Sequence, residues 1–160
     1  MDPSVCREHL TTLLSEEAGL LGKLEALLER EHEVLQGNDV GALNATALER
    51  QERIGALARL EEQRRSLCRM HGHSPDLAGL EQLMAWCDPA GSLISRLRVC
   101  ADGAARCRDL NDRNGTLVNA RLKRVEGLLG VLTGSAEPGN TYGPKGAYAS
   151  SRAGRVLGAA

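Results

Sequence analysis

The sequence predicts an all-helical protein, because its composition lacks what a β-sheet needs and its leucines recur with helical spacing. Aromatic residues make up only 2% of the 160 residues, with no Phe, one Trp and two Tyr. Strands of a sandwich or barrel favour aromatic and β-branched side chains, so these folds and a compact α/β enzyme are disfavoured. Hydrophobic residues nevertheless reach 42% and charged residues 26%, a balance typical of long helices and coiled coils.

The first predicted helix covers residues 4–36, where leucines recur every seven residues. Its columns are Leu14, Leu21, Leu28 and Leu35, then Leu13, Leu20, Leu27 and Val34, with Leu10 and Leu24 in a third. A seven-residue period is the signature of a coiled coil, and a stripe this wide can meet more than one partner helix. Gly37 ends the helix and Asn38-Asp39 caps the next one, which predicts a tight helical hairpin.

Three further helices are expected, over residues 39–71, 75–87 and 89–133. The second is more polar and ends at His71-Gly72-His73. Ser74-Pro75 then opens a short helix as N-cap and first residue, and Asp88-Pro89 opens the longest helix in the same way. We therefore expect an elongated antiparallel bundle of three long helices with a short bridging helix. Its core should include Leu14, Leu21, Leu28, Leu57 and Leu97, and residues 1–133 should contain no β-sheet.

The composition of the sequence changes after Gly134, where glycine and proline become frequent and aliphatic residues rare. Such a segment cannot bury enough apolar surface to offset the entropy of ordering it. We therefore expect a bundle over residues 1–133 and a flexible tail over residues 134–160.

Charge and cysteine content restrict the function classes. The net charge is −1, which gives no general attraction to nucleic acid or anionic lipid. Residues 1–36 carry eight acidic and three basic residues, and residues 88–133 carry five acidic and eight basic ones, so the first and last helices are expected to pair. No secretory signal or membrane-spanning run is evident, and five cysteines at irregular spacing fit reduced thiols. The expected location is the cytoplasm.

Candidate chemistry is sparse. Cys68, His71, His73 and Cys87 form the one weak candidate for a metal or redox site, but zinc sites use two closely spaced ligand pairs. A polar helix end with ordinary thiols is the simpler interpretation. Neither a nucleophile with its base nor a phosphate-binding loop is recognisable, so we expect no catalytic residues, no metal and no cofactor.

The last predicted helix is more informative. Its 4-3 line includes two polar residues, Asn111 and Asn114, followed by Gly115. A buried Asn at such a position fixes helix register. Alternatively, Gly115 loosens the helix at this point and separates a half that builds the bundle from a half that binds a partner. Aliphatic residues then exceed one bundle stripe: Leu117, Val118, Leu122, Val125, Leu128, Leu129, Val131 and Leu132. They are either buried between the other two helices or form a surface for another protein's amphipathic helix.

These residues resemble the FlgN family of flagellar type III export chaperones. The resemblance is carried by Arg108-Asp109-Leu110-Asn111-Asp112-Arg113-Asn114-Gly115 and continues through residues 125–132. It reappears as Tyr142-Gly143-Pro144-Lys145-Gly146, similar to the tail motif of the family. The N-terminal half agrees only in its leucine heptads and in residues 61–65.

The resemblance implies a cytosolic chaperone without enzymatic activity. Its clients would be the hook-filament junction proteins, which present a C-terminal amphipathic helix, and it would escort them unassembled to the export gate at the inner membrane. The export ATPase is a further candidate partner. The client-binding residues would be Asn114, Leu117, Val118, Leu122, Val125, Leu128, Leu129 and Leu132, and Tyr142 and Gly143 would dock at the gate. The alternatives are a structural coiled-coil adaptor without client hand-off, or a Cys/His metal or redox sensor.

Overall fold

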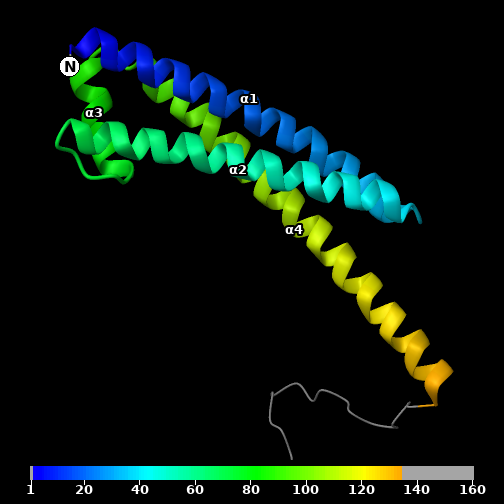
Figure 1. Cartoon of the computed structure of the whole chain (residues 1–160). Coiled ribbons are helices and arrows are strands. Elements are labelled where there is room, and N and C mark those ends of the chain that lie inside the picture. The colour runs from blue at the N-terminus through cyan, green and yellow to red at the C-terminus, as the bar shows by residue number, and fades with distance from the viewer. Residues whose placement is uncertain (1, 135–160) are drawn as a thin grey trace, which may run out of the picture. The chain divides into compact units, whose positions relative to one another are not determined.

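The computed structural model describes residues 2–134, and this part of the chain is helical throughout apart from short turns (Figure 1). The helices are α1 (Pro3–Gln36), α2 (Val40–Met70), α3 (Leu77–Cys87) and α4 (Ser92–Thr133). No strand occurs within residues 2–134, so the all-helical prediction is confirmed. The expected tail after Gly134 lies outside the described residues.

The chain divides into two compact units, Met1–Leu122 and Lys123–Ala160. Helix α4 begins in the first unit and ends in the second. The domain boundary after residue 133 that the sequence predicts stays a prediction.

The hairpin between α1 and α2 forms where the sequence predicts it. Gly37 closes α1 by donating its N–H to the carbonyl of Val34. Asp39 caps α2, because its Oδ1 accepts the N–H of Ala42 at 2.9 Å. A carboxylate at this position satisfies one of the helix's free N–H groups, so the turn is determined by local chemistry.

Helices α3 and α4 begin at Leu77 and Ser92, shortly after the predicted starts at Pro75 and Pro89. Asp76 caps α3 by accepting the N–H of Gly79 at 2.9 Å. Asp88 ends α3, and its Oδ2 accepts the N–H of Leu93 at 2.7 Å in the first turn of α4. This hydrogen bond lowers the pKa of Asp88. One buried carboxylate therefore joins the end of α3 to the start of α4.

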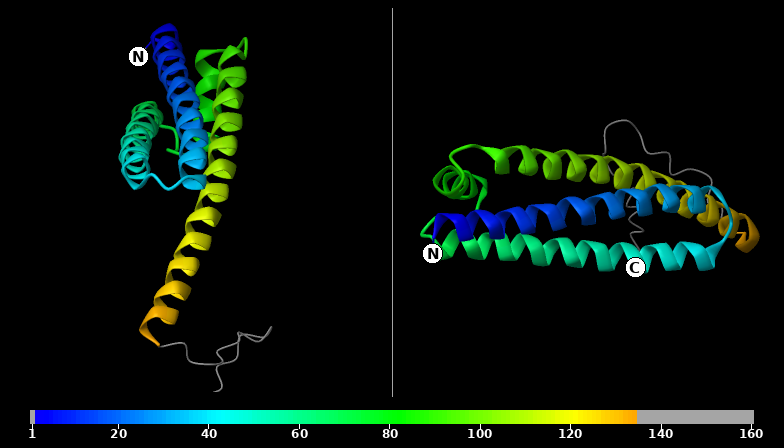
Figure 2. Two further views of the ribbon diagram at one scale, coloured as in Figure 1. Left: turned by 90° about the vertical axis from the view of Figure 1, so that its right-hand side faces the viewer. Right: turned by 90° about the horizontal axis from the view of Figure 1, so that it is seen from above.

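Within the first unit, α1 lies between α2 and the first part of α4 (Figure 2). Helix α2 runs antiparallel to α1, as the pairs Arg64–Glu17 at 2.5 Å and Arg50–Glu31 at 2.9 Å show. Helix α4 runs parallel to α1, since its contacts advance together with those of α1 along the chain. The short helix α3 packs against both α1 and α2.

The core is built on α1, and the prediction of its leucines is partly right. Leu14, Leu21 and Leu28 are buried, but Leu57 on α2 and Leu97 on α4 are only half-buried at its edge. Because α2 and α4 lie on opposite sides of α1 (Figure 2), leucines of the outer helices are covered from fewer directions. The remaining core members are Cys6, Leu10, Leu24, Leu27, Leu67, Cys68, Leu80, Leu83, Met84, Cys87, Leu93, Cys100 and Cys107.

Opposite charges on α1 and α4 pair as the sequence predicts. Arg106 meets Glu25 at 3.0 Å, and Arg113 meets Glu29 at 2.9 Å. All four side chains are substantially exposed to solvent, so each pair contributes at most about 1 kcal/mol to stability. These ion pairs therefore matter more for which helix packs beside α1 than for the stability of the fold.

Gly79→Ala should destabilise the protein by about 1–3 kcal/mol, as overpacking in a filled site does. A Cβ at this position would lie 1.9 Å from the Ser74 carbonyl oxygen, so the first turn of α3 would have to move. Urea unfolding followed by circular dichroism measures the change.

Gly22→Ala in α1 is the matched control, since a Cβ there meets nothing within 4 Å. It should stabilise the protein by up to about 1 kcal/mol through helix propensity. Equal stability of Gly79→Ala and the parent would contradict the packing of α3 described above.

Candidate functional site

Helix α4 contacts the backbone of α1 through small side chains that recur every seven residues. Cys100 Sγ donates a hydrogen bond to the carbonyl of Leu14, with 3.3 Å between sulfur and oxygen. Seven residues later, Cys107 Sγ donates to the carbonyl of Leu21 at 3.5 Å. Burial raises the pKa of Cys100 to about 11, so this thiol keeps its proton at neutral pH. Both cysteines therefore act as small neutral donors.

Asn114 continues this seven-residue series with a stronger donor. It is 1% exposed, and its Nδ2 donates to the carbonyl of Leu28 at 2.8 Å and to Glu31 Oε1 at 3.3 Å. Its Oδ1 lies 3.1 Å from His32 Nδ1, which must be the donor because an amide oxygen only accepts. His32 Nε2 then accepts from Gln36 Nε2 at 3.1 Å. The asparagine is thus fully bonded to α1.

Glu31 extends this network to α2. Its carboxylate is 3% exposed and accepts from Arg50 Nη1 at 2.9 Å. A buried carboxylate needs such a partner, so Asn114, Glu31 and Arg50 connect the three long helices at one level. Asn114 is buried against α1, as its interpretation as a register residue requires, whereas Asn111 is exposed and takes no part in the network.

The aliphatic residues after Asn114 are progressively exposed. Leu117 is half-buried, and Val118 and Leu122 are exposed. Between residues 125 and 132, five aliphatic side chains are 52–81% exposed: Val125, Leu128, Leu129, Val131 and Leu132. Burial between the other two helices is therefore wrong for these residues. Val125, Leu128, Leu129 and Leu132 have the i, i+3, i+4, i+7 spacing of one helix face. We call these four residues the aliphatic face of α4.

Arg121 lies between the Asn114 network and the aliphatic face. Its guanidinium donates to the carbonyl of Gly37 and to Asn38 Oδ1. A cation is favourable at the C-terminal end of a helix, where backbone carbonyls are unpaired. Arg121 therefore ties α4 to the turn between α1 and α2.

Sequence reasoning missed the roles of Arg121 and the cysteines, although a signal was present. Cys100, Cys107, Asn114 and Arg121 are spaced by seven residues, and each is small or polar where a coiled coil usually has a large aliphatic residue. The spacing alone cannot reveal that their partners are backbone carbonyls.

The four weak metal candidates divide between the core and partly exposed positions. Cys68 and Cys87 are buried in the core, and the ring of His71 packs against Trp86 with 5.1 Å between centroids. His73 Nδ1 lies 3.2 Å from Gln82 Oε1. Within residues 2–134, no three His, Cys, Asp or Glu side chains are grouped so that they could hold a metal ion.

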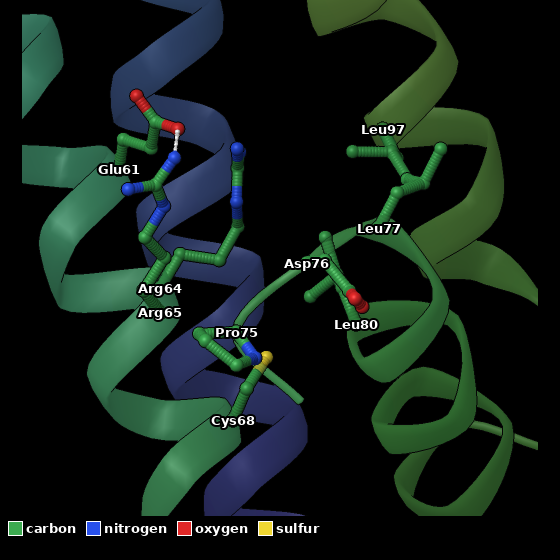
Figure 3. Close-up of a pocket in the computed structure, with 9 residues that line it drawn as sticks. All are labelled: Glu61, Arg64, Arg65, Cys68, Pro75, Asp76, Leu77, Leu80 and Leu97. Carbon is green, nitrogen blue, oxygen red and sulfur yellow. Dashed lines mark hydrogen bonds and ion pairs between the residues drawn. The ribbon is translucent and has the colours of Figure 1, made fainter. Parts of the chain in front are cut away.

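A cavity of about 350 Å³ lies between α2, α3 and the start of α4 (Figure 3). Its polar side chains are engaged, since Arg64 pairs with Glu17, Arg65 pairs with Glu61 and Asp76 caps α3. Across from Arg64 and Arg65, the wall consists of Leu77, Leu80 and Leu97 together with Asp76. The full lining is Glu61, Arg64, Arg65, Cys68, Pro75, Asp76, Leu77, Leu80 and Leu97. The one thiol of the lining, Cys68, is buried, and burial raises its pKa.

Comparison with known proteins gives one match. A family model described as FlgN protein matches residues 1–150. No curated protein and no solved structure matches the chain. None of the helices described in the structure is long and apolar enough to cross a membrane.

Asn114→Ala should lower the free energy of unfolding by about 2–3 kcal/mol. It removes the buried amide and leaves the carboxylate of Glu31 with one donor fewer, and such losses cost about 1–3 kcal/mol per unsatisfied group. Chemical denaturation measures the change.

Asn111→Ala is the control, because Asn111 stands on the same 4-3 line but is exposed. It should change stability by less than about 0.5 kcal/mol. Similar effects of the two substitutions would contradict a special role for Asn114.

Proposed function

Because this chain belongs to the FlgN family of flagellar export chaperones, we propose that it binds the C-terminal amphipathic helices of hook-filament junction proteins. It keeps these clients from assembling early and escorts them to the type III export gate. In this proposal the chaperone works in the cytoplasm and reaches the inner membrane only when it docks there with its client. The export ATPase is a further candidate partner.

The aliphatic face of α4 is the observation that carries this proposal. A contiguous set of exposed aliphatic side chains on a soluble protein usually marks a surface that another molecule covers. Spacing at i, i+3, i+4 and i+7 fits a partner helix lying along α4. Full burial of a Leu or Val side chain contributes about 1.5–3 kcal/mol. Burial of several such side chains against a client helix is sufficient for reversible binding.

The residues proposed for client binding have two different roles. Leu117, Val118 and Leu122 precede the aliphatic face on α4 and belong to the first unit; in this proposal they also contact the client. Asn114 is buried and bonded to α1, so it contributes by holding α4 in register. This division supports a chaperone whose binding helix is anchored at one end by a packed core.

The gate-docking proposal rests on Tyr142 and Gly143, which lie outside the described residues. Tyr142 is one of three aromatic residues in the chain and stands in a glycine- and proline-rich sequence. Tyrosine supplies a large contact area at low entropy cost and is frequent among binding hot spots. We propose that it anchors a short linear motif at the export gate.

Replacing Leu128 and Leu132 together by Gln should weaken client binding by more than about a hundredfold, from the apolar burial that is lost. Both residues are exposed, so helicity should be unchanged in circular dichroism. Isothermal titration with the C-terminal helix of a junction protein measures the affinity.

Val99→Gln is the matched control, because it removes an exposed aliphatic residue of α4 outside the proposed site. Its affinity should equal that of the parent. Unchanged binding in the double variant would remove the aliphatic face from the proposal. Absence of client binding by the parent would favour a structural adaptor.

Tyr142→Ala should leave client binding and thermal stability nearly unchanged while weakening docking at the gate. Truncation of a hot-spot residue costs about 2 kcal/mol or more, which is roughly a thirtyfold loss in affinity. Titration against the cytoplasmic domain of the export gate tests this, with Tyr148→Ala as the control. Equal gate affinity for Tyr142→Ala and the parent would make Tyr142 incidental.

A further inference from the structure

The register of α4 shows which of its surfaces is built to receive a helix. In the first unit, α1 contacts the line of Cys100, Cys107 and Asn114. A neighbouring line contains Gly103, whose Cβ would lie 3.4 Å from Leu21 Cβ. Since α4 is one continuous helix over Ser92–Thr133, both lines can be followed by steps of seven residues.

The helix that occupies this surface, α1, has a distinct chemistry. It presents leucines every seven residues, and residues 1–36 carry eight acidic and three basic side chains. Glutamates stand at the edges of the contact, where Glu25 meets Arg106 and Glu29 meets Arg113. The α4 surface is therefore already occupied, in the first unit, by an acidic leucine-repeat helix.

Between residues 123 and 133, the same lines continue without an acidic partner. The line of Cys107 and Asn114 reaches Leu128, and the line of Gly103 reaches Arg124. The Arg124 side chain makes no ion pair or hydrogen bond with any residue that the structure describes. Lys123 follows the line of the exposed residues Asp109 and Thr116, on the opposite side of the helix. Arg121, on the line that reaches Leu128, is bonded to Gly37 and Asn38. Arg124 is therefore the cation without a partner among the described residues at the Leu128 edge of the aliphatic face, and Glu126 lies beyond Leu129 at the other edge.

We infer that the aliphatic face of α4 selects an acidic amphipathic helix, with an aliphatic seven-residue repeat like that of α1 and a carboxylate placed to meet Arg124. This inference rests on the proposed function and names the chemistry of the client helix. Charges that flank an aliphatic seam determine which helices pair, because opposite charges attract and like charges repel at the edge of the contact. A basic helix with the same leucines should bind less tightly than the acidic one.

Two synthetic peptides test the selection. Both have the same leucine repeat over about three heptads, one with Glu and the other with Lys at the flanking positions. Fluorescence anisotropy with the full chain at physiological salt measures both affinities. The parent should bind the Glu peptide about three- to tenfold more tightly than the Lys peptide. Arg124→Glu should reverse this order.

Lys123→Glu is the matched control, with the same change of charge one residue away, on the side of α4 that lies opposite the aliphatic face. It should keep the preference of the parent, because charges beyond about 8 Å are screened at this ionic strength. Equal binding of the two peptides by the parent, or the same preference in Arg124→Glu, would overturn the inference.

The experiment separates this inference from the proposed function. Binding of a junction-protein helix without preference between the Glu and Lys peptides would leave the chaperone role intact and overturn only the charge selection. Failure to bind any of these helices would overturn both. Binding to anionic phosphatidylglycerol vesicles, lost in the Leu128 and Leu132 double variant while neither peptide binds, would overturn the inference in favour of a lipid surface.

Discussion

The contact between α4 and the backbone of α1 is the constraint on which the rest of this structure depends. Cys100, Cys107 and Asn114 donate to carbonyls of α1 that are seven residues apart. Gly103 has no side chain of its own to hold the two helices apart. Interaxial distance follows the size of the side chains at the contact, so small residues here bring the helices close. Every donor meets its carbonyl only in one register, and this register determines which surface α4 presents to α1 within the first unit.

Polar groups rather than aliphatic ones mark the end of the packed region. Asn114, Glu31 and Arg50 join three helices where the leucine columns would also allow shifted pairings. Buried polar groups of this kind contribute less to stability than to a unique arrangement. Because Asn114 finds its partners at Leu28, Glu31 and His32, a shift of α4 along α1 would leave buried groups without partners.

This arrangement explains how a small helical protein can keep an aliphatic surface open. Most leucines of α1 are buried in the core of the first unit, whereas the aliphatic face of α4 is exposed. That face contains only Val and Leu, and aliphatic side chains bind without strict directional demands. Such a surface suits the proposed binding and release of a client helix, and the inferred charge selection by Arg124 would act at its edge.

The sequence by itself determined the helical class, the turn at Gly37 and Asp39, the leucine stripes of α1 and the excess of aliphatic residues at the end of α4. These features follow from local propensity, capping and periodicity, which act within a few residues. Only the tertiary structure decided that Asp76 caps α3 and that α4 begins at Ser92. It also decided that Leu57 and Leu97 are half-buried, and that Asn114 is buried while Asn111 is exposed. A periodic pattern states which face of a helix is apolar, but which neighbour covers that face depends on contacts between residues as many as 86 positions apart.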